Sequence, residues 1–332
     1  MMASTAIQAF ASQYSLYSNF IISIVGIISN VINLLVFVQL KPFRENRCGF
    51  YLIVESVSDL VDVTFILIIT IVSLVYGDES LNYSLLWCRI RYITFQTGTL
   101  TTFSMICFAA IDQYCSTNYR LSLRQFCNLK LARYLVLTSV CLWFVHSLIF
   151  GLFADVNPTV GCYISNSVWI RYGTYFFYPI LYGFLPIALA SLFSILAYRN
   201  VRRIIRRQIP IERRRFDRQI TAMVLIRVGW FVTVSIPYTS YRVYSINVST
   251  KQVDALRSAI ERLIQVIFYS IINTNYALNF YIFLISSSRY RRQVKYIFKK
   301  KYWRQIKCLC CLGDNQVRPE NTMMSDANID LD

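Results

Sequence analysis

Three acidic residues lie inside one long apolar stretch of the chain, where an ionised side chain is costly. Glu55, Asp59 and Asp62 are spaced i, i+4 and i+7, so a helix would place all three on one face. An ionisable group at membrane depth marks a functional site by default, and three carboxylates on one buried face need a cation, protons or hydrogen-bond donors. Asn275 and Asn279 form a second i, i+4 pair, which could face Asp59.

A cation stands at a matching depth in another apolar stretch. Arg227 lies nine residues in from Arg218, about 13 Å of helix, and Glu55 lies eight residues in from Arg47, about 12 Å. These depths predict an intramembrane ion pair between Glu55 and Arg227. The alternative is that the Arg227 side chain extends toward the membrane surface instead.

Seven apolar stretches must position these side chains. Of the 332 residues, 56% are hydrophobic and only 15% are charged, which is too apolar for an ordinary soluble domain. Each stretch is long enough to cross a bilayer, and backbone amides in hydrocarbon must pair within their own segment. We therefore predict an all-α membrane protein, a seven-transmembrane helix bundle. The stretches cover approximately residues 16–40, 50–76, 88–114, 131–153, 172–198, 220–246 and 260–285.

The stretch 88–114 is expected to be the central helix, because its many small and hydroxyl residues suit packing by other helices on all sides. The net charge of +17 is concentrated in the first, third and fifth gaps and after the seventh stretch. That distribution disfavours nucleic-acid binding and predicts a multi-pass plasma-membrane protein whose N-terminus is outside.

Modifiable residues fit this orientation. Asn82 and Asn247 each begin an N-glycosylation sequon in a gap assigned outside, although such sequons also arise by chance. Cys88 and Cys162 also lie at outside positions, where a disulfide is permitted, and we favour the disulfide over two free thiols. The ten cysteines form no zinc-binding pattern, and no nucleophile–base pair is evident, so an enzyme is not expected.

Four regions are expected along the chain: a short extracellular N-terminus (1–15), the bundle (16–288), an amphipathic helix on the inner leaflet (289–305) and a disordered cytoplasmic tail (306–332). The tail begins near Cys308, Cys310 and Cys311, which are candidates for palmitoylation or are simple reduced thiols. His146, the single histidine, is expected to be a buried, hydrogen-bonded imidazole.

Over residues 16–305 the chain resembles a rhodopsin-like (class A) G-protein-coupled receptor. The resemblance is carried by the order and spacing of Asn30, Asp59, Cys88, the triplet 112–114, Trp143, Pro186, Pro237, Asn279 and Tyr290. It implies an extracellular ligand, a heterotrimeric G protein as partner, and coupling through Asp112, Gln113, Tyr114 and Asp217. It also implies a polar network with Asn30 and a sodium pocket of Asp59, Thr102, Asn275 and Asn279. A protonated Asp59 in a hydrogen-bonded network is the alternative to sodium, and no other cofactor is expected.

Several positions depart from the family pattern. Gln113 stands where the family has arginine, Ser235 replaces a tryptophan, and Phe280 and Phe283 replace a proline and a tyrosine. A Gln113–Asp217 hydrogen bond would be weaker than the usual ion pair. A receptor-shaped scavenger or dimer partner that does not couple is therefore a second hypothesis. A transporter or channel is less favoured, because no inverted repeats or paired broken helices are apparent.

The ligand class is suggested by what the outer ends contain. Phe95 replaces the aspartate of amine receptors, and Asn273 stands where opsins carry the retinal lysine, so monoamines and retinal are disfavoured. A mouth rich in Tyr and Arg suits a neuropeptide-type or anionic ligand. Candidate pocket residues are Phe95, Gln96, Arg171, Tyr238, Arg242 and Tyr269.

Overall fold

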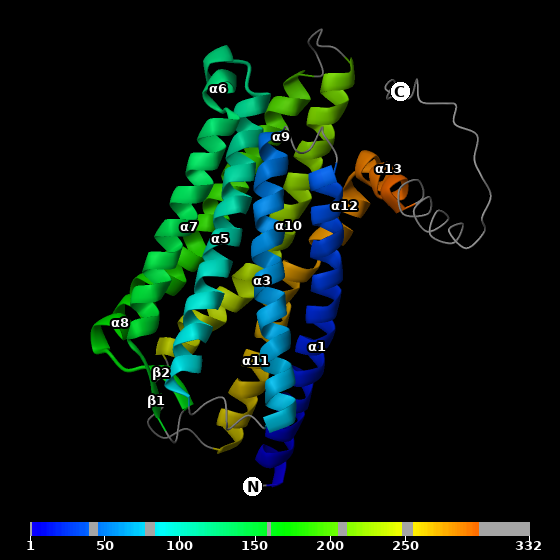
Figure 1. Cartoon of the computed structure of the whole chain (residues 1–332). Coiled ribbons are helices and arrows are strands. Elements are labelled where there is room, and N and C mark those ends of the chain that lie inside the picture. The colour runs from blue at the N-terminus through cyan, green and yellow to red at the C-terminus, as the bar shows by residue number, and fades with distance from the viewer. Residues whose placement is uncertain are drawn as a thin grey trace, which may run out of the picture. The chain divides into compact units, whose positions relative to one another are not determined.

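The computed structural model describes residues 2–39, 46–76, 84–157, 161–204, 211–247 and 255–298. The chain divides into two compact units, residues 1–291 and 292–332. The first unit is a bundle of long helices that run side by side (Figure 1). Its helices are α1 (Met2–Gln39), α3 (Arg47–Tyr76), α5 (Leu85–Thr117), α6 (Leu121–Phe126), α7 (Leu129–Leu152), α8 (Ser167–Tyr172), η1 (Gly173–Phe184), α9 (Leu185–Ile204), α10 (Ile211–Asn247), α11 (Ala255–Ala277) and α12 (Asn279–Ser286). A further helix, α13 (Ser288–Tyr296), begins in the first unit and ends in the second.

Five helical segments of the described chain are long and apolar enough to cross a membrane by composition alone. They are α1, α3, α7, α10 and the continuous run from α8 through η1 into α9. The remaining two long helices, α5 and α11, carry more polar side chains. Their polarity follows from their place in the bundle, since the middle of α5 buries Thr99, Thr101 and Thr102 against other helices rather than exposing them to lipid.

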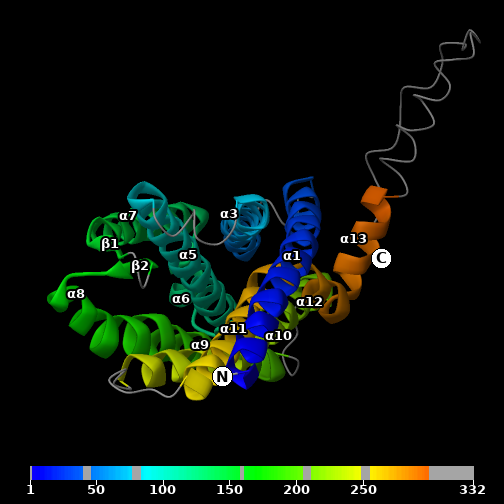
Figure 2. The same ribbon diagram turned by 90° about the horizontal axis from the view of Figure 1, so that it is seen from below.

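Helix α5 has the central position expected of the stretch 88–114. It packs against α3, α7, α9 and α10, whereas α1 packs mainly against α3 and α11. The end-on view in Figure 2 shows the helices surrounding α5 on several sides. Close approach of α5 to α3 depends on Gly98, because a Cβ atom at that position would overlap the Asp62 carboxylate.

The first helix starts well before residue 16, so the segment expected to be a short N-terminus is helical from Met2 onward. One face of this extension packs against other residues, while most of its side chains are exposed: Ala11 is fully buried, and the Tyr14 hydroxyl lies 2.9 Å from the Ser270 hydroxyl on α11. The candidate membrane span of α1 likewise begins at Ala3, before the start at residue 16 that the longest apolar run indicated.

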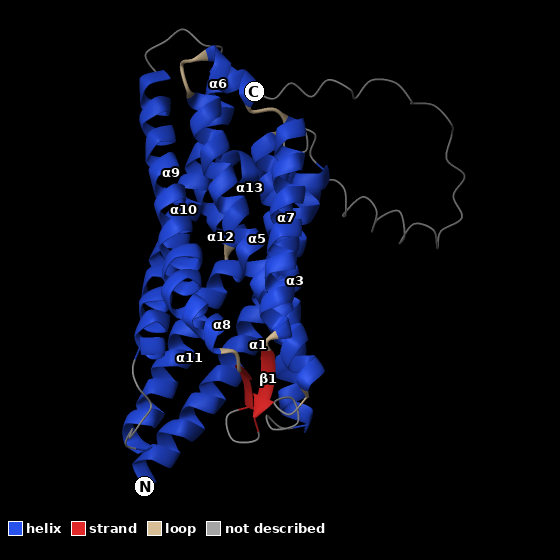
Figure 3. Ribbon diagram, turned by 90° about the vertical axis from the view of Figure 1, so that its left-hand side faces the viewer, coloured by secondary structure: helices blue, strands red, loops and turns tan. Residues whose placement is uncertain are grey.

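A two-stranded hairpin, absent from the expected all-α arrangement, lies at one end of the bundle (Figure 3). Strand β1 (Ala154–Asn157) pairs antiparallel with β2 (Gly161–Ile164), with Val156 opposite Cys162. Gly161 adopts a φ of 79°, a conformation that suits glycine. The disulfide between Cys88 and Cys162 attaches β2 to the start of α5. We call this end the hairpin end, and the opposite end, which carries α6, the α6 end.

The fifth span contains a π-helical segment, η1, with Pro179 inside it. The Leu185 amide donates to the Ile180 carbonyl five residues earlier, which is the π-helical pattern. In this π-helical segment the aromatic side chains of Phe177, Tyr178 and Tyr182 face the interior of the bundle, where they line a cavity.

The seventh span, expected as one stretch from 260 to 285, is broken between α11 and α12 at Leu278. An unbroken helix would bond the Phe280 amide to the Tyr276 carbonyl. Instead, the Phe280 amide donates to the Ser29 hydroxyl at 3.4 Å, and the Tyr276 carbonyl accepts from the Asn30 amide at 2.8 Å. Two neighbouring side chains of α1 therefore satisfy both ends of the missing helical bond.

Candidate functional site

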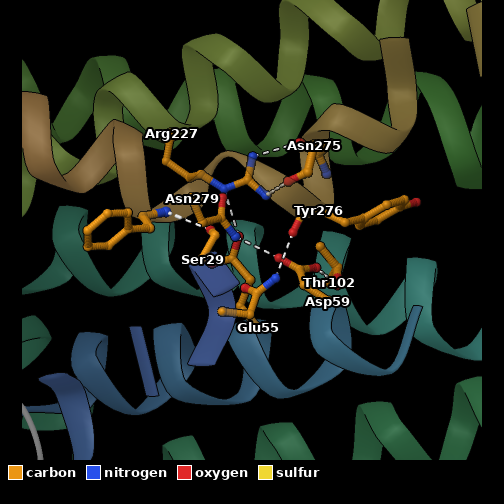
Figure 4. Close-up of polar contacts among 10 residues, drawn as sticks. Ser29, Glu55, Asp59, Thr102, Arg227, Asn275, Tyr276 and Asn279 are labelled. Atoms are coloured by element: carbon orange, nitrogen blue, oxygen red, sulfur yellow. Dashed lines mark hydrogen bonds and ion pairs between the residues drawn. The ribbon is translucent and has the colours of Figure 1, made fainter. Parts of the chain in front are cut away.

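Arg227 of α10 lies fully inside the bundle and is hydrogen-bonded to polar groups on two other helices (Figure 4). Its Nε atom donates to Glu55 Oε1 on α3 at 2.7 Å. Its Nη1 and Nη2 atoms donate to the side-chain and backbone oxygens of Asn275 on α11, at 2.6 and 3.2 Å. Both charged residues are about 1% exposed. The guanidinium therefore joins α10 to α3 and α11 without reaching the surface.

Asp59 has hydrogen-bond donors on both of its oxygens. The Thr102 hydroxyl on α5 donates to Oδ1 at 2.7 Å, and the Asn279 amide on α12 donates to Oδ2 at 2.6 Å. The same Asn279 amide lies 3.3 Å from Glu55 Oε1. Asn279 thus faces Asp59 as its spacing suggested, but Asn275 does not, because its oxygen is bonded to Arg227.

The third carboxylate is in a different situation. Asp62 is completely buried, and within the described chain neither of its oxygens has a hydrogen-bond partner. It lies against Gly98 of α5, one turn nearer the hairpin end than Asp59. Among the described residues, no group of three or more His, Cys, Asp or Glu side chains is arranged to hold a metal ion.

At the α6 end, α5 is held to its neighbours by its last two turns. Asp112 forms an ion pair with Arg47 at 3.3 Å, and the Gln113 side chain accepts a hydrogen bond from Thr221 on α10 at 3.0 Å. Tyr114 packs against Phe193 of α9. The side chain of Asp217 lies outside the described residues, so the expected Gln113–Asp217 bond is not placed; Thr221, one turn further along α10, is the contact that the sequence did not indicate.

A cavity of about 550 Å³ opens between the helices toward the hairpin end. Five of the six candidate pocket residues line it, and so do two further arginines, Arg91 and Arg262. The five are Phe95, Gln96, Tyr238, Arg242 and Tyr269. Arg262 was missed, although the sequence held a signal for it: Arg262, Gln265, Tyr269, Asn273 and Tyr276 recur at helical spacing, and all five line the cavity.

Arg171 does not line the cavity. It lies on α8, where Trp169 and Tyr172 pack inward against α7: Trp169 stacks on Phe153, and the Tyr172 hydroxyl lies 2.8 Å from the ring of His146. Arg171 is exposed, and at about 100° per residue it lies to one side of Tyr172 and nearly opposite Trp169 on this short helix.

Arg242 packs against an aromatic ring of the cavity wall. Its guanidinium carbon lies 4.3 Å from the ring centroid of Tyr178, a cation–π contact. Its Nε atom is buried and has no hydrogen-bond partner in the described structure. No aspartate or glutamate is present among the described residues that line the cavity. Three arginines without a lining carboxylate leave the cavity with positive charge to be matched.

Other residues singled out in the sequence are placed away from this cavity or are not described. His146 is hydrogen-bonded to Tyr172 as expected, but it is half-buried rather than buried, and its ring lies 3.4 Å from Gln96 of the cavity wall. Asn82, the side chain of Asn247, and Cys308, Cys310 and Cys311 lie outside the described residues.

The helix bundle, the disulfide between α5 and the hairpin, and the cavity beside that hairpin define a membrane receptor of the seven-helix class. A family model described as "7 transmembrane receptor (rhodopsin family)" matches residues 29–279, well over half of the chain. The chain therefore belongs to the rhodopsin family of G-protein-coupled receptors, and is a multi-pass membrane protein and a receptor rather than an enzyme. No curated protein matches the chain.

Proposed function

We propose that this receptor binds an extracellular peptide through the arginine-lined cavity and signals to a heterotrimeric G protein at the α6 end. The hairpin end is then extracellular and the N-terminus is outside, since the gaps richest in Lys and Arg fall at the other end. The observation that carries the ligand assignment is the charge of the cavity: Arg91, Arg242 and Arg262 face it, with no described carboxylate.

The chemistry of these arginines favours a ligand with an acidic group. Guanidinium groups present several donors in a plane and bind carboxylates in pairs of parallel hydrogen bonds. The unpartnered Nε of Arg242 is a donor that a bound carboxylate would satisfy. The volume of about 550 Å³ suits the end of a peptide rather than a whole one. The ligand is thus a peptide whose free C-terminus or acidic side chain enters the cavity.

A binding experiment tests the ligand class. Peptide libraries would be prepared in pairs, as free acids and as C-terminal amides, and screened on cells that express the receptor. Hits should be free acids or should carry Asp or Glu, and Arg242→Gln should weaken their binding at least tenfold. Arg171→Gln is the matched control, because it removes an exposed arginine outside the cavity. Equal effects of the two substitutions, or a preference for cationic amines, would contradict the assignment.

Coupling to a G protein rests on the family and on the α6 end of α5. Gln113 cannot supply the positive charge of an arginine, but its bond to Thr221 joins the same two helices, α5 and α10. We expect G-protein dissociation on ligand addition in the wild type, with a larger response in Gln113→Arg. If the wild type binds ligand but only Gln113→Arg ever responds, the second hypothesis holds: a scavenger or dimer partner that does not couple.

A further inference from the structure

The family resemblance implies a sodium ion beside Asp59, and the residues of this chain do not fit one. A sodium site needs several oxygen atoms turned toward one point. Here both Asp59 oxygens already accept hydrogen bonds, from Thr102 and Asn279, and the Asn275 side-chain oxygen accepts one from Arg227. Asn279 turns its NH2 group, not its oxygen, toward Asp59. All four residues of the implied pocket are thus engaged in hydrogen bonds of this network.

We propose that the guanidinium of Arg227 is the permanent cation of this site and makes the receptor independent of sodium. The positive charge is covalently attached to α10 and lies within the network rather than beside it, bonded to Glu55 and to both oxygens of Asn275. It neutralises one of the two carboxylates, and the hydroxyl and amide donors stabilise the other. A second cation would be repelled by the first, strongly so because both would be buried.

The proposal accounts for the residue types as a set. Glu55 and Arg227 are each about 1% exposed, and each supplies the other's charged partner. Arg227 is among the largest fully buried side chains of the described chain, and its Nε, Nη1 and Nη2 atoms all have oxygen partners. A cation fixed this firmly cannot exchange with solvent, whereas a free ion can.

A thermal-stability experiment tests the proposal on the full-length receptor, purified in detergent. Melting temperatures would be compared in sodium chloride and in choline chloride at equal ionic strength. The wild type should melt at the same temperature in both salts. The double variant Arg227→Leu/Glu55→Leu removes the fixed cation with its counter-ion and frees Asn275. Sodium at about ten times its Kd should stabilise it by about 1.4 kcal/mol, which corresponds to a melting temperature about 3–6 °C higher in sodium.

A triple variant gives the control. Adding Asp59→Asn to the double variant should abolish the sodium effect, because the Asp59 carboxylate that would bind the sodium ion is lost. Stabilisation of the wild type by sodium would overturn the proposal. This holds even if the Asp62→Asn substitution were found to remove the stabilisation. A double variant that folds and shows no sodium effect would overturn the claim that Arg227 is what excludes the ion. If the double variant does not fold, the comparison of salts on the wild type still decides the first claim.

Discussion

Removing one member of the Glu55–Arg227 pair should cost far more stability than removing both. Arg227→Leu leaves the Glu55 carboxylate buried, with only the 3.3 Å contact from Asn279. Breaking a buried pair in this way typically costs about 3–5 kcal/mol. At roughly 2–4 °C per kcal/mol, the melting temperature should fall by about 6–20 °C. Glu55→Leu should be milder, because Arg227 keeps both bonds to Asn275.

The double variant isolates the interaction. With both charges gone, two leucines fill adjoining space in the bundle, and a buried ion pair replaced by apolar residues is often neutral in stability. We expect the double variant to be more stable than Arg227→Leu alone, with an interaction energy of about 3 kcal/mol in the double-mutant cycle. Since the pair joins α10 to α3, Arg227→Leu should also raise basal signalling wherever the receptor couples.

Thermal melts of the four proteins, with basal G-protein dissociation in cells, measure both effects. The matched control is a cycle on Arg257 and Glu261, an ion pair of similar length, 3.1 Å, on the exposed face of α11. That cycle should show no coupling beyond experimental error, because solvent screens exposed pairs. Additive single effects in the Glu55–Arg227 cycle would refute the reasoning, since independent residues cannot be partners.

Three further predictions concern packing and backbone. Gly98→Ala should lower the melting temperature, because the added methyl group overlaps the Asp62 carboxylate. In an Asp62→Ala background the overlap is gone, and the same substitution should raise the melting temperature, since alanine's helix propensity is worth about 1 kcal/mol more than glycine's. A decrease in both backgrounds would contradict the contact. Ser29→Ala should cost about 1–2 kcal/mol of stability, because it leaves the Phe280 amide without a hydrogen-bond partner. Adding Phe280→Pro to that variant should restore stability, since proline has no amide hydrogen. If thermal melts show no such rescue, the Ser29 hydroxyl has another role. Replacing Cys88 and Cys162 together by serine should cost about 2–4 kcal/mol and make the melting temperature insensitive to reductant, which the wild type should not be.

The seven-helix fold could be predicted because lipid imposes a simple rule on composition and length. The central position of α5 was also predictable, since its hydroxyl-rich surface suits only burial among helices. The depth argument placed Arg227 opposite Glu55, and the structure joins these two side chains at 2.7 Å. Depth along a helix axis is set by the number of residues, at about 1.5 Å each, so it can be predicted without knowing how the helices pack.

What the sequence could not supply is rotation about the helix axes and local departures from regular helix. The spacing of Asn275 and Asn279 suggested one shared face, but the break at Leu278 separates them and leaves Asn275 on Arg227. The π-helical segment around Pro179 changes which aromatic residues reach the cavity. The helical extension before residue 16 is less apolar than the seven stretches, and the contact of Tyr14 with Ser270 on α11 is one that only the folded chain reveals.

The break in the seventh span is made by a neighbour rather than by its own sequence. A proline at position 280 would have no amide hydrogen, so the interruption would be permanent. The Phe280 amide donates a hydrogen bond to the Ser29 hydroxyl instead. The Tyr276 carbonyl, which would accept that amide in a continuous helix, accepts a hydrogen bond from Asn30. The interruption of the seventh span therefore depends on the position of α1, whose Ser29 and Asn30 side chains hold the two backbone groups that a continuous helix would join.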